Sequence, residues 1–251
     1  LKCSGFPIRE YDNKIPSTLT AEQILIRSGN IGSVKIGQMV GEDKLKSFLS
    51  KIDVLQKTNF DIEEIGKPIK FKWGKCPLAT ASFGHGITTT LLQLAKAYSI
   101  IVNGGYNIQP KLIKETKKIK KEKILNQEVS KEILPILRKI VTSKEGTASL
   151  ANVSGYEIGG KTGTAQKSEG GVYTKKKLNS FISVFPISKP KFVLAVMLDE
   201  PKTNEDYIYH YRDGSNIKYK GTPYNTSGWT TVEVTGQIIE KIGPILATKY
   251  S

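Results

Sequence analysis

Cysteine, histidine and long apolar stretches are scarce in this chain of 251 residues, and each shortage excludes a class of protein. The two cysteines and two histidines stand apart, so neither a four-ligand zinc site nor a histidine-based catalytic triad can be assembled. Cys3 and Cys76 could pair in an oxidising compartment, but we expect them to remain unpaired. No apolar run reaches about 18 residues, so the sequence predicts no membrane-spanning helix.

Lysine is abundant instead, and it gives the chain a net charge of +15. Such a charge would suit nucleic acid or an anionic surface. The densest lysine cluster, from Lys114 to Lys123, contains two glutamates and no aromatic residue that could stack on a base. We therefore interpret this cluster as a solvated hairpin or loop, and we expect no nucleic-acid partner.

The hydrophobic content of 38% is enough for the core of one large domain or two small ones. The opening residues Leu1-Lys2-Cys3-Ser4 include neither an initiator Met nor the apolar core of a signal peptide. We therefore expect the chain to be an excised piece, or a domain whose targeting segment and membrane anchor lie elsewhere.

Apolar periodicity predicts that the first part of the chain is mostly helical. The expected segments are a helix over 20–40 that breaks at Ser28-Gly29-Asn30, a short helix over 43–51, a polar excursion over 58–77, a helix over 88–103 that is apolar almost all round, and a helix over 126–142 that contains Pro135. A helix with as little polar face as 88–103 belongs in the middle of a domain.

The second part predicts strands. Residues 181–185 and 192–198 should form a hairpin around the turn at 188–191, and an apolar-faced helix should close the chain over 232–246. Helices followed by a β-meander and a terminal helix indicate an α+β fold with an antiparallel sheet. We expect a mostly helical part over about 1–145 and a sheet part over about 146–251.

The segment Lys161-Thr162-Gly163-Thr164-Ala165-Gln166 carries the strongest functional signal. A lysine supplies positive charge, the hydroxyls supply hydrogen-bond donors, and the glycine removes a side chain that would block a substrate beside an edge strand. The segment resembles the K-T-G element of penicillin-binding proteins and serine β-lactamases. We predict that it lines an acyl-transfer site.

A second element, Ser28-Gly29-Asn30, offers a hydroxyl and an amide two residues apart at a helix break. The Ser28 hydroxyl can move a proton, and the Asn30 amide can hold an amide carbonyl of a substrate. Taken alone, this pattern also makes ordinary turns.

With these elements in order, the chain resembles the transpeptidase domain of class B penicillin-binding proteins, and the cell-division group in particular. The resemblance runs from Thr18 to about Ala247. The matching segments are Ser28-Gly29-Asn30, the stretch Phe83-Gly84-His85-Gly86-Ile87 with Leu92-Gln93-Leu94-Ala95, the helix stop Asn103-Gly104-Gly105, the strand Lys161–Gln166, and Trp229 with the terminal helix.

The resemblance implies a serine β-lactamase/D,D-transpeptidase-like fold, here N-terminally incomplete, and a penicillin-binding enzyme that cross-links peptidoglycan without a cofactor. It implies that Ser28 relays a proton, that Asn30 holds the substrate amide, and that Lys161 sets a positive potential. Thr162 and Thr164 would donate to the substrate carboxylate, beside Gly163, and the Thr164 backbone N–H would form half of the oxyanion hole. Expected partners are peptidoglycan stem peptides, β-lactams, other cell-division proteins and an upstream part of the same protein, at the outer face of the bacterial cytoplasmic membrane.

The departure from the family pattern concerns the nucleophile. The family's serine and lysine lie in an S-x-x-K segment upstream of S-x-N, and we expect both outside these residues. Ser188-Lys189-Pro190-Lys191 fits the pattern, but it follows K-T-G and contains a proline that spoils a helix turn, so we reject it. Glu122–Asn126 mimics the water-positioning segment of class A β-lactamases, and we interpret it as solvated charge.

His85, between two glycines, is expected either to occupy a turn or to lie at the cleft rim and touch an acceptor strand. Two other functions are weighed against the transpeptidase: a non-catalytic penicillin-binding-like sensor or decayed fragment, and a basic surface-binding protein. The long, ordered set of matches argues against the basic surface-binding protein.

Overall fold

The computed structural model describes residues 1–3, 6–114, 122–170, 172–221 and 224–250. The chain divides into two compact units, Leu1–Ile133 and Leu134–Ser251, which are described in turn. Most of the lysine cluster lies at 115–121, outside the described residues, so its interpretation as a solvated loop stays a prediction. The expected division near residue 145 also stays a prediction.

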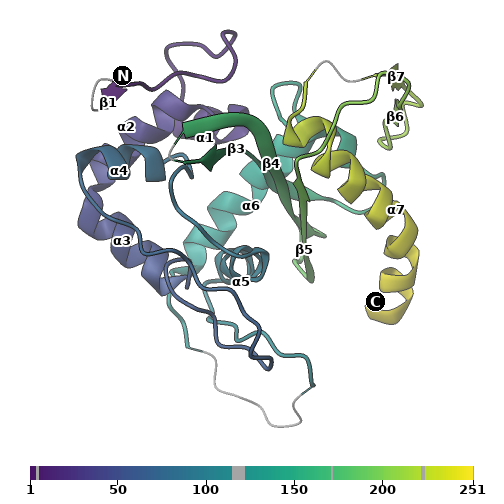
Figure 1. Cartoon of the computed structure of the whole chain (residues 1–251). Helices are drawn as coiled ribbons and strands as arrows, with labels where there is room; N and C mark the ends of the chain where they lie inside the picture. Colours follow the sequence, from purple (N-terminus) through teal and green to yellow (C-terminus); the bar gives the residue numbers. More distant parts are fainter. Residues whose placement is uncertain (4–5, 115–121, 171, 222–223, 251) are drawn as a thin grey trace. The chain divides into compact units, whose positions relative to one another are not determined.

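The first unit is built from short helices, which Figure 1 labels along the chain. They are α1 (Ala21–Arg27), α2 (Asn30–Val40), α3 (Glu42–Lys51), α4 (Lys75–Ala81) and α5 (Leu91–Val102), preceded by the paired strands β1 (Lys2–Cys3) and β2 (Phe6–Pro7). The sequence predicted all of these helices except α4, which begins inside the stretch expected to be irregular. α6 (Gln127–Thr142) continues through Pro135 and contains the point where the two units divide.

Threonine caps fix where two of these helices begin. The Thr20 hydroxyl accepts the Gln23 N–H, and the Gln23 side chain accepts the Thr20 N–H in return. Thr90 and Gln93 make the same capping box at the start of α5. Each box satisfies two helix-terminal N–H groups that have no partner within the helix.

A buried polar core holds the loop after α3 against α5. Gln93 is fully buried, and its amide donates to the carbonyls of Asp53, 3.0 Å away, and Gln56, 2.6 Å away. Lys96, also buried, forms an ion pair with Asp53. These groups satisfy one another beside an apolar cluster of Ile52, Val54, Ala97 and Ile100.

Cys3 and Cys76 form a disulfide, so the expectation that they remain unpaired is wrong. The bond joins β1 to α4, with the Cα atoms 5.4 Å apart. The two cysteines are 73 residues apart in the chain, and α4 is the helix that the sequence did not predict. The approach of β1 to α4 is therefore what brings the two thiols together.

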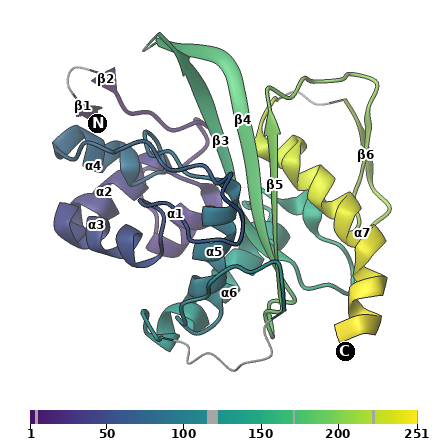
Figure 2. The ribbon, with the colours of Figure 1, turned by 60° about the horizontal axis from the view of Figure 1, so that its bottom comes forward.

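The second unit is built on a three-stranded antiparallel sheet in the order β3-β4-β5 (Figure 1). Its strands are β3 (Gly159–Glu169), β4 (Val172–Phe185) and β5 (Phe192–Asp199), so the predicted hairpin is confirmed and the K-T-G strand lies at an edge. A small second sheet pairs β6 (Ile208–His210) with β7 (Lys218–Lys220). The terminal helix α7 (Thr231–Tyr250) packs on β4 and β5 (Figure 2).

The apolar core of this unit joins the sheet to α7 through Val153, Ile158, Phe185 and Ile239. Two short 3₁₀ turns, η1 (Ser149–Ala151) and η2 (Ser227–Trp229), also contact α7. Because η2 ends just before α7 begins, the position of this turn is set by the same helix that covers the sheet.

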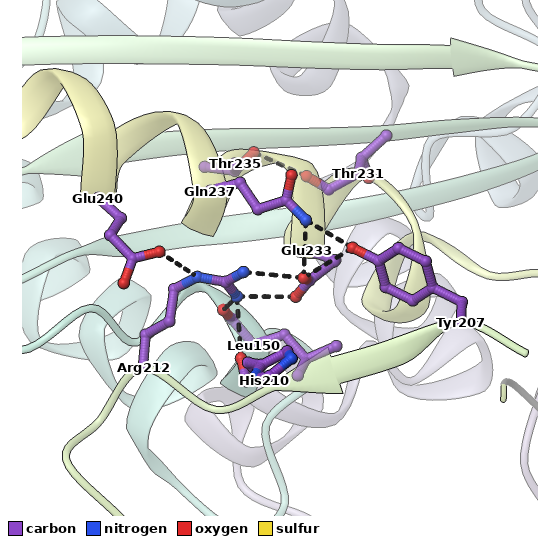
Figure 3. Close-up of polar contacts among 9 residues, drawn as sticks. All are labelled: Leu150, Tyr207, His210, Arg212, Thr231, Glu233, Thr235, Gln237 and Glu240. Carbon is purple, nitrogen blue, oxygen red and sulfur yellow. Dashed lines mark hydrogen bonds and ion pairs between the residues drawn. The ribbon is translucent and has the colours of Figure 1, made fainter. Parts of the chain in front are cut away.

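A buried ion pair fixes α7 to the rest of the second unit (Figure 3). Arg212 and Glu233 form two parallel hydrogen bonds of 2.8 Å, and both side chains are almost completely buried. Arg212 also donates to the carbonyls of Leu150 in η1 and His210 in β6. One guanidinium group therefore joins three elements, and its hydrogen bonds to Glu233 are the main reason that its pKa is raised.

None of the helices in the described part of the chain combines the length and hydropathy that a bilayer crossing requires. Across these same described ranges, no three acidic, histidine or cysteine side chains are placed to hold a metal ion.

Candidate active site

The motif Lys161-Thr162-Gly163-Thr164 lies in the first half of β3. Its neighbour on one side is β4, in a register that pairs Gly163 with Ser180 and Thr164 with Asn179. An edge strand presents backbone hydrogen-bonding groups on its outer side, where an extended peptide can add. The strand is therefore suited to bind a peptide substrate.

Lys161 is half-buried, and its ammonium group donates to the carbonyl of Thr162 at 3.0 Å. Burial lowers the pKa of Lys161 to about 8. At neutral pH the side chain is thus charged, but it stands close to its titration point, and its charge acts where water screens it less.

The two threonine hydroxyls have partners from outside the sheet. Thr162 Oγ1 lies 2.7 Å from Thr147 Oγ1, and Thr164 Oγ1 accepts the backbone N–H of Ser227 at 3.0 Å. Thr164 is an exposed residue. Thr147 and Ser227 were not predicted, because nothing in the sequence near either residue indicates contact with β3.

Gly163 lies where β4 comes close. A Cβ at this position would lie 2.7 Å from the Ser180 hydroxyl, so any larger residue would have to turn that side chain aside. Close packing of β3 against β4 therefore favours glycine at this position. This adds to the expected role of Gly163, which is to leave open space for a substrate.

Ser28 and Asn30 lie where α1 ends and α2 begins, so the predicted helix break is confirmed. Ser28 caps α1 in a left-handed conformation with φ 57° and ψ 42°. Glu10 accepts the N–H groups of Asn30, at 2.6 Å, and Ile31, at 3.0 Å. A carboxylate at a helix N-terminus is favourable, and this one fixes the start of α2.

The side chain of Asn30 is also oriented from the preceding loop. Its amide group donates to the carbonyl of Arg9 at 2.9 Å. Sequence reasoning did not find Arg9 and Glu10, which lie about 20 residues before Asn30. No local pattern marks them, because they act only through the fold.

His85 lies in the turn after α4, where its backbone N–H donates to the Thr80 carbonyl at 2.9 Å. Its ring stacks on Phe83 with the ring centres 5.9 Å apart, and burial lowers the pKa of the imidazole. The role of His85 at a cleft rim stays a prediction.

The structure thus places Ser28, Asn30 and His85 in the first unit, and Lys161 to Thr164 in the second. Within the second unit, the lysine and both threonines lie on one strand with hydroxyl partners around them.

The pattern S-x-x-K occurs at Ser188–Lys191 and also at Ser215–Lys218. The first lies in the turn after β4, and the Ser188 backbone N–H donates to Glu157 at 3.2 Å. The second runs from a loop into β7. Neither is helical, so neither places its serine and lysine one helical turn apart on the same face.

Comparison with known proteins identifies relatives over nearly the whole chain. The family model described as the penicillin binding protein transpeptidase domain matches residues 2–216. The "Probable peptidoglycan D,D-transpeptidase FtsI" of Caulobacter vibrioides is 27% identical over 93% of this chain and 39% of its own length. The "Stage V sporulation protein D" of Bacillus subtilis is 36% identical over 72% of this chain and 30% of its own length.

A solved structure shares the fold. The transpeptidase domain of penicillin-binding protein 3 from Burkholderia pseudomallei is 26% identical, with a TM-score of 0.80 over 100% of this chain and 70% of that chain. The chain spans 39% of the length of the Caulobacter vibrioides relative and 30% of the length of the Bacillus subtilis relative.

Proposed function

Because the chain belongs to the penicillin-binding protein transpeptidase family, we propose that it forms part of a peptidoglycan D,D-transpeptidase. The observation that carries this proposal is the edge strand β3, where Lys161, Thr162 and Thr164 gather one positive charge and two hydroxyls. A peptide that ends in D-Ala-D-Ala has an extended backbone for the strand edge and a carboxylate for these groups.

We place the nucleophilic serine and its lysine base in an S-x-x-K segment upstream of Leu1. The serine oxygen attacks the penultimate D-Ala carbonyl carbon, and the lysine takes its proton. The C–N bond then breaks, and Ser28 relays a proton to the departing D-Ala amine. An acceptor amine attacks the resulting ester, and the serine recovers its proton as it leaves.

The residues of this chain bind and polarise the substrate in that scheme. Asn30 holds the substrate amide, and its orientation by Arg9 supports this role. Lys161, Thr162 and Thr164 hold the terminal carboxylate, and the Thr164 N–H supplies half of the oxyanion hole. A β-lactam with a carboxylate in the same position would use the same groups.

The disulfide supports a location outside the cytoplasm, because such bonds persist in oxidising compartments. We propose that the domain works at the outer face of the bacterial cytoplasmic membrane, held there by an anchor elsewhere in the protein. The names of the relatives, a peptidoglycan transpeptidase and a sporulation protein, favour cell-wall synthesis over a sensor without activity, and we propose that the domain acts in cell division.

The proposal is tested by measuring the release of D-Ala from a stem pentapeptide. The protein used should include the residues that are encoded before Leu1. We expect Ser28→Ala and Asn30→Ala to lower the rate by about a hundredfold or more, because each removes a group that acts at the reacting atoms. Ser215→Ala, outside the site, should leave the rate unchanged. Full activity of both site variants would contradict the proposal, as would a stop codon directly before Leu1.

A further inference from the structure

Ser227 is a buried serine at the start of η2, and it contacts the candidate site without belonging to the motif. Its exposed fraction is 1%. Its backbone N–H donates to Thr164 Oγ1, and its hydroxyl donates to the Ser180 carbonyl at 2.6 Å. One residue therefore contacts both strands of the pair that carries the motif.

The contact with Thr164 determines what that hydroxyl can do. A threonine hydroxyl has one hydrogen and two lone pairs. Because one lone pair accepts the Ser227 N–H at 3.0 Å, the Thr164 hydrogen must point away from Ser227. Thr164 is an exposed residue, so a ligand that reaches its hydroxyl from solvent would meet it as a donor, which is the polarity that a carboxylate needs.

The residues just after η2 also hold this turn in place. Thr231 Oγ1 lies 2.7 Å from Ser227 Oγ and donates to the Ser227 carbonyl at 3.3 Å, so the Thr231 hydroxyl contacts Ser227 at both its side chain and its backbone. The Asn179 amide donates to Thr230 Oγ1 at 2.9 Å. Ser180 and Asn179 are the register partners of Gly163 and Thr164, so β4 fixes the turn directly behind the motif.

We infer that Ser227 is a positioning residue for carboxylate recognition, which keeps the Thr164 hydroxyl turned toward the substrate as a donor. The inference rests on the proposed function. It adds a residue 63 positions away from the motif threonine and explains why a serine hydroxyl is buried there. Alanine at this position would keep the backbone N–H but remove the hydroxyl hydrogen bond between Ser227 and Ser180 of β4.

The test compares two acylating agents on the protein that includes the sequence before Leu1. Benzylpenicillin carries the carboxylate that Thr164 would bind, and its methyl ester does not. For Ser227→Ala we expect the acylation rate constant with benzylpenicillin to fall about tenfold, as for one lost hydrogen bond to a charged group, and the rate with the ester to stay the same.

Ser183→Ala is the matched control, because Ser183 is also buried and donates to a backbone carbonyl, that of Leu194 at 3.1 Å. Ser183→Ala should not change the ratio of the acylation rate constant with benzylpenicillin to the rate constant with the methyl ester. Thr231→Val, which removes the donor to Ser227, should lower the ratio in the same direction as Ser227→Ala. If Ser227→Ala fails to fold, Thr231→Val provides the test in its place.

A double-mutant cycle with Thr164→Val separates positioning from general damage. If Ser227 acts through the Thr164 hydroxyl, Ser227→Ala should have no further effect on the ratio in a Thr164→Val background. An equal loss with both agents, or additive effects of the two substitutions, would overturn the inference. Absence of acylation of the unsubstituted protein would overturn the proposed function, and the inference with it.

Discussion

At the scale of single residues, Lys161 shows how burial sets a functional property. The side chain lies beside the Thr162 carbonyl in a place where burial lowers its pKa to about 8. A cation there attracts a carboxylate strongly, since less water screens it. The same burial makes the charge sensitive to alkaline pH, so attraction of the carboxylate should weaken as the pH rises through about 8.

The lowered pKa of Lys161 also predicts how stability depends on pH. An unfolded lysine titrates near about 10.4, so between pH 8 and that value the unfolded chain binds more protons than the folded chain. The free energy of unfolding should therefore rise with pH across this window. Urea unfolding at several pH values, compared between the parent and Lys161→Met, checks the effect, since the variant should lack this component. Identical slopes in the two proteins would contradict it.

At the scale of elements, α7 is fixed by one buried charge pair. Arg212 and Glu233 are hydrogen-bonded twice in a nearly dry environment, and Tyr207 and Gln237 complete the carboxylate's partners (Figure 3). A buried charge that loses its partner is costly, because water cannot replace that partner. The ion pair thus fixes the helix that packs beside η2 and Ser227.

Glu233→Gln should therefore lower the free energy of unfolding by about 3–5 kcal/mol, because it removes the buried counter-charge of Arg212 and leaves only the exposed carboxylate of Glu240. Glu240→Gln is the matched control, since Glu240 contacts the same guanidinium from an exposed position. Its substitution should cost less than about 1 kcal/mol. Urea midpoints of the two variants measure the difference, and similar midpoints would refute the account of α7.

Gly236 gives a second prediction on the same helix. Alanine normally stabilises a helix relative to glycine by about 1 kcal/mol. Here a Cβ would lie 2.6 Å from the Leu150 carbonyl oxygen and 3.2 Å from Arg212 Nη1, and that backbone carbonyl cannot rotate aside as a side chain can. Gly236→Ala should instead destabilise the protein by about 1–3 kcal/mol in thermal or urea unfolding. A stabilised variant would show that α7 and η1 are not packed this closely.

At the scale of the whole molecule, the sequence was informative where structure is local. The helices with threonine caps, the break at Ser28 to Asn30 and the edge strand with Lys161 were all predicted, because periodicity and short motifs determine them. The Cys3–Cys76 bond, the Ser227 contact and the Arg212 pair were not. They join residues 73, 63 and 21 positions apart, and only the folded chain brings such partners together.

The disulfide provides a prediction for the first unit. Because it closes a loop across 73 positions, its reduction should lower the free energy of unfolding by about 2–4 kcal/mol. Thermal unfolding with and without a reducing agent measures this, and a Cys3→Ser/Cys76→Ser variant should melt at the reduced protein's temperature under both conditions. A parent protein that is insensitive to reduction would contradict the pairing.

The central claim is that this chain supplies the carboxylate-binding wall of an acyl-transfer site whose nucleophile lies upstream. Labelling with a fluorescent penicillin, followed by mass-spectrometric location of the adduct, tests it most directly. We predict no stable label on the 251-residue chain alone, and a single adduct on an S-x-x-K serine when the preceding sequence is included. A stable adduct on any residue of the chain alone, including Ser188 or Ser215, would contradict the claim.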